Sequence, residues 1–378
     1  MLSTLFLSLF LQMSAPELPG PYLVVQRDVT LVDRVFQQGV VRARVYYPQS
    51  SEGPFPLVNF MHGFLSRPSD HDILCEHIAS YGFVVASTSG TSGFSPDTFD
   101  YAKDSRSILH AIEGLASQPG SWLEQIVEVG KDWAAVGHSM GGATLAFLVG
   151  LEPRVQTIIP LQPAAPESSA ENNLRNFEGT SVWIAGSEDW ICPPVVVRNG
   201  RNLCVSAKRN LYVLVQGMGH SGCTDSLPNN EPLPGNEQMD VHKRIVVSTL
   251  NAEMKGLEGY YEWVIGSSII FSEPWTVDVQ VSKPILVGGL LPTSLGYGLE
   301  LFGPPNTNAI VAGSLGRLDT SLDMSDAIRL QNLQLNSNGT VAWSQFVPPS
   351  LYGQTIYAQA LIADGTNRIS QVLEIFVQ

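Results

Sequence analysis

The feature that most constrains the fold of this chain is an alternation of short apolar segments with helical segments between residues 22 and 265. After two N-terminal strands, six short apolar runs are expected to form strands, and four longer segments helices. Helices that alternate with short apolar strands indicate a mostly parallel sheet covered on both faces. In such sheets ligands bind at the carboxyl ends of the strands. The expected strands are Leu23–Val25, Val41–Tyr47, Leu57–Met61, Phe83–Ser87, Trp133–Val136, Thr157–Ile159, Val182–Ala185 and Leu211–Val215. The expected helices are His71–Ser80, Phe99–Leu115, Gly142–Leu148 and Val241–Lys255.

Helical periodicity ends after about residue 265, and strand-like runs separated by Gly, Pro and Asn follow. Asn338-Gly339 is a typical hairpin turn. The length of 378 residues also exceeds what one hydrophobic core usually supports, about 250–300 residues. We therefore expect an α/β domain over residues 19–265 and an all-β sandwich over residues 268–378. The strands expected in the sandwich are Trp275–Val281, Ala309–Leu318, Ala327–Leu335, Val341–Phe346, Thr355–Ile362 and Ile369–Val377.

The composition is that of an ordinary globular protein with few charges, 44% hydrophobic and 15% charged residues. The formal net charge is −14. An acidic surface repels phosphate backbones, so nucleic acid is not an expected partner. An uncharged substrate fits this charge better than a polyanion does.

The N-terminus is apolar from Leu2 to Leu11, which is too short to span a bilayer as a helix. Residues 1–18 are therefore expected to be a signal peptide or anchor, which predicts a secreted, periplasmic or cell-surface protein. The segment is atypical, because no Lys or Arg precedes the apolar run and no clean cleavage site stands before Pro16. The alternative is a buried N-terminal helix.

Gly137–Gly141 reads Gly-His-Ser-Met-Gly, directly after one expected strand and before an expected helix. This context is what a nucleophile elbow requires, because the tight turn lifts the serine hydroxyl above the sheet and needs small flanking residues. Ser139 is therefore the predicted nucleophile. The alternative is an ordinary serine in a glycine-rich turn.

An oxyanion hole needs two backbone N–H donors that point at the developing charge. Met140, directly after the nucleophile, is expected to supply one of them. Phe64 is expected to supply the other, because it follows the strand Leu57–Met61 and Gly63 allows close approach. His62 is expected to be a structural residue of the same loop.

A serine nucleophile needs a histidine base, and that histidine needs an acidic residue to orient it. His220 follows the strand Leu211–Val215 and is the predicted base, whereas His242 is expected to be a solvated helix residue. Asp189 follows the strand Val182–Ala185 and is the predicted acid, with Glu188 as the alternative. No cofactor is expected.

These motifs resemble those of the polyester-hydrolase (cutinase-like) and dienelactone-hydrolase-related α/β hydrolases. The resemblance is carried by Gly137–Gly142, by the Asp189 loop with Pro193, and by Gly217–Ser221. It implies the α/β-hydrolase fold, a Ser-His-Asp triad and a carboxylic ester hydrolase that forms an acyl-enzyme. Dienelactone hydrolases carry a cysteine nucleophile, which is Ser139 here.

Two further segments, Phe55–Phe64 and His77–Val85, resemble chlorophyllases and platelet-activating-factor acetylhydrolases. Together the similarities cover about residues 20–265. Polyester hydrolases carry an aromatic platform after the strand that follows the nucleophile helix, and here Leu161–Pro166 contains no tryptophan. The resemblance therefore indicates the fold and the triad and does not fix the substrate. Because no long insertion that could form a lid separates the expected strands, the expected substrates are small to medium, uncharged or lipid-like esters, with polyesters as a further candidate.

The four cysteines are an even number, which permits disulfides in an exported chain. Cys192–Cys223 would join the acid and base loops, as in some polyester hydrolases, and Cys192–Cys204 is an equally economical pairing. Cys75 is expected to be a buried helix thiol. His71 and Cys75 have metal-ligand spacing, but no further ligand accompanies them, so no metal is expected.

An open apolar cleft is expected beside the triad, lined by Phe64, Trp190 and Met218. The C-terminal aromatics are expected in a core, with a carbohydrate-binding or surface-binding platform as the alternative, and the protein is expected to be a monomer. Two other functions stay open: an exported non-catalytic binding or adhesion protein, and a peptidase or acyltransferase with the same triad. The C-terminal aromatics are Trp275, Tyr297, Trp343, Tyr352 and Tyr357.

Overall fold

The computed structural model describes most of the chain. The described residues are 15–37, 39–90, 96–266, 273–293, 296–315, 317–318, 321–322, 327–345, 349–351, 354–363, 368–370 and 373–376. Residues 1–14 of the expected signal segment and Tyr352 lie outside them.

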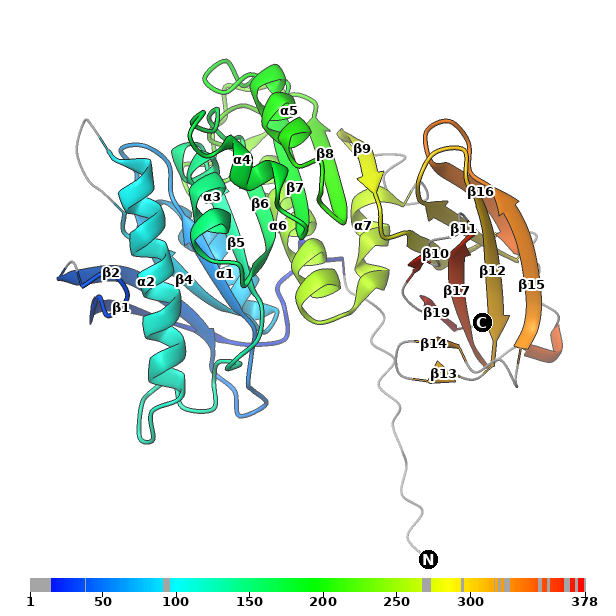
Figure 1. Cartoon of the computed structure of the whole chain (residues 1–378), viewed down its shortest axis with the longest axis horizontal. Coiled ribbons are helices and arrows are strands. Elements are labelled where there is room, and N and C mark those ends of the chain that lie inside the picture. The colour runs from blue at the N-terminus through cyan, green and yellow to red at the C-terminus, as the bar shows by residue number, and fades with distance from the viewer. Residues whose placement is uncertain are drawn as a thin grey trace, which may run out of the picture.

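A nine-stranded sheet in the order β1-β2-β4-β3-β5-β6-β7-β8-β9 forms the centre of the α/β part (Figure 1). The six neighbouring strands β4, β3, β5, β6, β7 and β8 run parallel to one another. Strands β1, β2 and β9 pair antiparallel with their neighbours. A mostly parallel sheet is what the alternating pattern predicted. The strands are β1 (Val24–Val32), β2 (Val40–Pro48), β3 (Leu57–Met61), β4 (Val84–Thr88), β5 (Trp133–His138), β6 (Val155–Leu161), β7 (Thr180–Gly186), β8 (Arg209–Val215) and β9 (Trp275–Val281).

Helices cover both faces of this sheet, and each face has its own hydrophobic core. Alternate residues of β3 divide between the two cores, with Val58 and Phe60 in one and Leu57 and Met61 in the other. The first core also receives residues of α1 and α6, and the second receives residues of α2, α3 and α5. The helices are η1 (Pro68–His71), α1 (Asp72–Ser80), α2 (Thr98–Ala116), α3 (Met140–Leu151), α4 (Glu171–Arg175), α5 (Pro194–Leu203), α6 (Gly235–Met254), η2 (Glu258–Tyr261) and α7 (Glu262–Ile265).

Strand β9 corrects one part of the sequence analysis. It was expected in the C-terminal sandwich, but it pairs with β8 over its whole length and forms the edge of the central sheet. Trp275 at its start is buried in the first core. The alternating pattern of a half-buried strand does not indicate which sheet the strand joins, so the sequence could not settle this point.

The remaining C-terminal strands form small antiparallel sheets. One contains β10, β11 and β16, another contains β15, β12, β17, β18 and β19, and β13 pairs with β14. Leu286 and Leu301 of the first sheet share a core with Val311 and Ala360 of the second. The strands are β10 (Ile285–Thr293), β11 (Gly296–Phe302), β12 (Asn308–Ser314), β13 (Arg317–Leu318), β14 (Ser321–Leu322), β15 (Ala327–Gln334), β16 (Thr340–Gln345), β17 (Thr355–Ile362), β18 (Arg368–Ile369) and β19 (Leu373–Phe376), with the short helix η4 (Pro349–Leu351).

The turn at Asn338-Gly339 forms as expected, with Gly339 at a φ of 75°. It does not close a hairpin, because β15 before it and β16 after it belong to different sheets. In the described part of the chain, no helix combines the length and hydrophobicity that crossing a bilayer requires.

Candidate active site

Ser139 lies in a strained turn between the end of β5 and the start of α3. Its φ of 54° and ψ of −117° are unusual for a residue other than glycine. Small neighbours make this turn possible, since a Cβ on Gly141 would lie 2.1 Å from the Met61 carbonyl oxygen. A Cβ on Gly137 would lie 2.5 Å from the Gly141 carbonyl oxygen. The turn therefore has the geometry of a nucleophile elbow.

The structure brings together Ser139, His220 and Asp189, which come from the ends of three strands. His220 Nε2 lies 2.9 Å from Ser139 Oγ. His220 Nδ1 lies 2.8 Å from Asp189 Oδ2. Because an ionised carboxylate only accepts hydrogen bonds, Nδ1 carries the proton and Nε2 is left to accept from the serine hydroxyl.

The carboxylate of Asp189 is held by its own loop and is only 2% exposed. Its Oδ1 accepts hydrogen bonds from the backbone N–H groups of Ile191 (2.9 Å) and Cys192 (2.8 Å). The neighbouring Glu188 is exposed and its carboxylate contacts Ser187 instead. Asp189 is thus the residue of this pair that meets His220.

The loop after β3 lies against the nucleophile. A Cβ on Gly63 would lie 3.2 Å from Ser139 Cβ, so glycine permits this close approach. Met140, the other expected N–H donor, is the first residue of α3. His62 is buried, and its ring nitrogens lie 2.9 and 2.7 Å from the carbonyl oxygens of Gly63 and Ser89.

Large apolar side chains are exposed on the two loops beside the triad. Phe64 and Leu65 of the β3 loop are 44% and 65% exposed, and Trp190 and Ile191 of the acid loop are 84% and 52% exposed. Met218 was expected beside Phe64 and Trp190, but it is fully buried in the first core. Sequence position did not reveal this, because Met218 and His220 lie in the same loop and only the folded structure shows that Met218 is buried.

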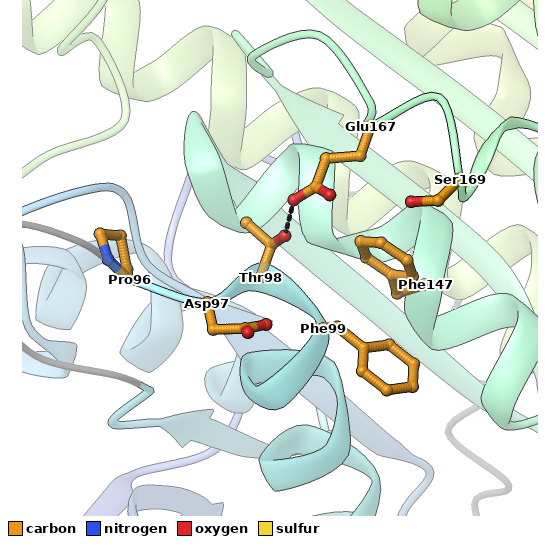
Figure 2. Close-up of a pocket in the computed structure, with 7 residues that line it drawn as sticks. All are labelled: Pro96, Asp97, Thr98, Phe99, Phe147, Glu167 and Ser169. Atoms are coloured by element: carbon orange, nitrogen blue, oxygen red, sulfur yellow. Dashed lines mark hydrogen bonds between the residues drawn. The ribbon is translucent and has the colours of Figure 1, made fainter.

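A separate cavity of about 540 Å³ lies between the N-terminus of α2, helix α3 and the loop after β6 (Figure 2). The Thr98 hydroxyl donates to the Glu167 carboxylate across it, and the rings of Phe99 and Phe147 are 5.3 Å apart. None of the seven residues that line it belongs to the triad.

All four cysteines, each in the described part of the chain, are buried free thiols. The expected pairings Cys192–Cys223 and Cys192–Cys204 are therefore wrong. The sulfur atoms have different neighbours: Cys192 contacts Ser139, Cys204 contacts Ser181 and Trp183, and Cys223 lies near two histidines. Burial raises the pKa of Cys192 to about 11.

His242 is another correction, because it is fully buried and not solvated. Its Nδ1 donates to the Gln238 carbonyl oxygen at 2.7 Å, and its Nε2 accepts from the side-chain amide nitrogen of Gln162 at 2.9 Å. Burial lowers its pKa to about 4. His242 lies on the face of α6 that packs on the sheet. The helical pattern of the sequence did not show that His242 belongs to this face.

Sequence reasoning also missed a cluster of His71, His138 and Cys223. Each offers one ligand atom, these atoms lie within 4.8 Å of one another, and all three residues are buried. His71 and Cys223 are 152 positions apart, so no local spacing could indicate the cluster. Cys75, whose spacing to His71 suggested a ligand pair, is not part of it.

Several known proteins are similar in sequence to this chain. Residues 14–229 match the family described as PET hydrolase-like. Bis(hydroxyethyl) terephthalate hydrolase of Streptomyces coelicolor is 31% identical over 176 residues, 45% of this chain and 53% of the relative. Chlorophyllase-2 of Arabidopsis thaliana is 31% identical over 120 residues, 30% of this chain and 36% of the relative. Cutinase est1 of Thermobifida alba is 27% identical over 145 residues, 38% of this chain and 46% of the relative.

The chain thus spans about half or less of the length of these curated relatives. The family match covers more than half of the chain, from before β1 to the loop that carries His220. The chain belongs to the PET hydrolase-like family of α/β hydrolases.

Proposed function

We propose that this protein is a carboxylic ester hydrolase in which Ser139 is the nucleophile, His220 the general base and Asp189 the residue that orients it. The observation that carries the proposal is the continuous chain of contacts, 2.9 Å from serine to histidine and 2.8 Å from histidine to aspartate. A serine hydroxyl with a hydrogen-bonded, oriented imidazole is an activated nucleophile.

In the proposed reaction Ser139 Oγ attacks the ester carbonyl carbon while His220 Nε2 takes the hydroxyl proton. The backbone N–H groups of Phe64 and Met140 stabilise the tetrahedral oxyanion. His220 then gives the proton to the departing alcohol, which leaves an acyl group on Ser139. Water activated by the same imidazole hydrolyses that acyl-enzyme.

The proposed substrates are uncharged esters with an apolar acyl or alcohol group. The exposed side chains of Phe64 and Trp190, on the two loops beside Ser139, support an open apolar surface next to the nucleophile. A relative named for hydrolysis of bis(hydroxyethyl) terephthalate favours a small aromatic diester as one such substrate. Leu161–Pro166 contains no tryptophan, whereas Trp190 directly follows Asp189. We therefore propose Trp190 as an aromatic contact for the substrate.

The organisation proposed around this site is a catalytic domain followed by an accessory β-sandwich. Because β9 completes the central sheet, we extend the catalytic domain from residue 265 to Val281. The sandwich would then begin near β10, and its proposed role is contact with a surface or a carbohydrate. Export and a monomeric state remain part of this proposal.

The test is hydrolysis of p-nitrophenyl esters from acetate to palmitate, and of bis(hydroxyethyl) terephthalate. Wild type, Ser139→Ala and the exposed-serine control Ser117→Ala are compared, each checked for folding by circular dichroism. We expect activity in the wild type and Ser117→Ala that falls at least about 10³-fold in Ser139→Ala. A folded wild type without ester hydrolysis would favour a peptidase or a non-catalytic binding protein instead.

A further inference from the structure

Behind the nucleophile lies a buried cluster that the ester chemistry does not use. His71 ends η1, His138 ends β5, and Cys223 lies in the loop after β8. The three residues are 0%, 4% and 0% exposed, respectively. Their ligand atoms converge within 4.8 Å although they come from three separate segments.

Each of the two histidines has one ring nitrogen fixed by a backbone carbonyl. His71 Nδ1 donates to the Cys223 carbonyl at 3.1 Å. His138 Nε2 donates to the His220 carbonyl at 2.9 Å. A carbonyl oxygen can only accept, so these nitrogens carry the protons, and a neutral ring keeps its lone pair on the other nitrogen.

The lone-pair nitrogens are His71 Nε2 and His138 Nδ1, and both are buried without a hydrogen-bond partner among the described residues. A buried acceptor without a partner costs about 1–3 kcal/mol. Histidines that bind metals in proteins have this arrangement, with the second ring N–H donated to a backbone carbonyl or a carboxylate. Two such lone pairs beside a buried thiol therefore indicate a ligand set.

We propose that His71 Nε2, His138 Nδ1 and Cys223 Sγ bind one thiophilic metal ion, and that the ion is Cu⁺ in preference to Zn²⁺. On binding, a metal–sulfur bond replaces the S–H bond of Cys223, and the proton leaves to solvent. The metal keeps its oxidation state. Metal–ligand bonds of about 2.0–2.3 Å bring the ligand atoms to roughly 3.3–3.8 Å from one another. The present separations, of up to 4.8 Å, would shorten on binding.

The preference for Cu⁺ follows from charge and from ligand number. A thiolate and Cu⁺ with two neutral imidazoles form an uncharged complex, whereas Zn²⁺ leaves a buried positive charge, which is costly without a partner. Structural Zn²⁺ sites have four protein ligands, and the cluster supplies three. Soft thiolate ligands favour Cu⁺.

The ion would connect the strand that carries the nucleophile to the loop that carries the base. His138 directly precedes Ser139, and Cys223 follows His220 by three positions. The bound ion is therefore expected to raise the unfolding temperature, because it binds the assembled cluster more tightly than the separated side chains of the unfolded protein.

The test uses the full chain, reduced, freed of metal with a chelator and kept without oxygen. Wild type, Cys223→Ser and His71→Gln are incubated with Cu⁺ buffered by a colorimetric Cu⁺ chelator, or separately with Zn²⁺. Metal bound after desalting is measured by elemental mass spectrometry. Cys204→Ser is the matched control, since Cys204 is also a buried free thiol but contacts Ser181 and Trp183.

We expect about one Cu⁺ per chain and a higher unfolding temperature in wild type and Cys204→Ser. Cys223→Ser and His71→Gln are expected to retain no Cu⁺, and if one of them fails to fold, the other decides. Equal copper binding by wild type and the folded variants would overturn the proposal, as would no binding by wild type. Retention of Zn²⁺ with no Cu⁺ would overturn the stated preference. None of these readouts depends on ester hydrolysis.

Discussion

At the scale of single residues, the proposed triad depends on which carboxylate orients His220. Asp189 and Glu188 are adjacent in sequence, and both were candidates because the two follow the same strand. The structure separates them through backbone geometry: two N–H groups of the loop hold the Asp189 carboxylate, while Glu188 is exposed. The different environments of these neighbours allow a controlled comparison.

Asp189→Asn is expected to lower kcat by about 10³–10⁴-fold, because an amide in place of the carboxylate no longer holds the imidazole in the required tautomer. Glu188→Gln is the matched control and is expected to change kcat less than about twofold, since an exposed carboxylate away from the imidazole contributes little. The measurement is steady-state hydrolysis of a p-nitrophenyl ester. Equal losses in both variants would show that Asp189 has no special role.

Glycine substitutions test the elbow itself. Gly141→Ala is expected to destabilise the fold by about 1–3 kcal/mol, because backbone atoms that cannot move aside surround the new methyl group. A Cβ on Gly114, in α2, meets nothing within 4 Å. Gly114→Ala is therefore expected to stabilise the fold by about 0.5–1 kcal/mol. Urea unfolding measures both, and a stable Gly141→Ala variant would contradict the tight packing of the turn.

At the scale of elements, buried histidines connect helices to their surroundings. His77 of α1 lies 2.7 Å from the Pro16 carbonyl oxygen through Nε2, and His242 of α6 contacts Gln162. Burial lowers the pKa of both from 6.5 to about 4. Helix docking in this protein therefore depends on neutral imidazoles.

The free energy of unfolding is expected to fall as the pH drops from about 6.5 to 4. In this window the unfolded chain takes up protons that the folded protein does not, so each lowered histidine removes up to about 3 kcal/mol by pH 4. His242→Gln is expected to flatten this dependence, because glutamine does not titrate. Urea unfolding between pH 7.5 and 4.5 checks it, and parallel profiles of wild type and variant would contradict it.

A second link at this scale is the buried ion pair between β8 and α6. Arg209 Nη1 pairs with Glu253, and Arg209 Nη2 donates to Glu258 of η2 at 2.6 Å. Burial opposes ionisation of Glu253, yet the charges of Arg209 and Lys208 lower its pKa to about 2. The carboxylate therefore stays ionised in the interior.

Glu253→Gln is expected to destabilise the protein by roughly 3 kcal/mol, because Arg209 keeps its buried charge with one fewer partner. Glu171→Gln is the control, since Glu171 forms an exposed pair with Arg175 on α4 and is expected to change stability by less than about 0.5 kcal/mol. Unfolding in urea compares them. A loss for Glu253→Gln no larger than for the control would contradict the buried pair.

At the scale of the whole molecule, the sequence predicted the features that depend on local sequence patterns. The alternation of apolar strands and helices gave the parallel sheet, and the residues named for the triad lie within hydrogen-bond distance of one another. The failures concern contacts between distant segments. The partner of β9, the inward orientation of Met218, the burial of His242 and the separate neighbours of the four thiols all depend on tertiary packing. The cluster of His71, His138 and Cys223 belongs to the same class.

The most direct test of the proposed function is covalent labelling of Ser139. Wild type, Ser139→Ala and Ser117→Ala are treated with diethyl p-nitrophenyl phosphate, a reagent that phosphorylates activated serines, and intact and peptide masses are recorded. We expect a single diethylphosphoryl group on Ser139 in wild type and Ser117→Ala, and none in Ser139→Ala. A folded wild type that stays unlabelled, or a Ser139→Ala variant labelled to the same extent, would contradict it.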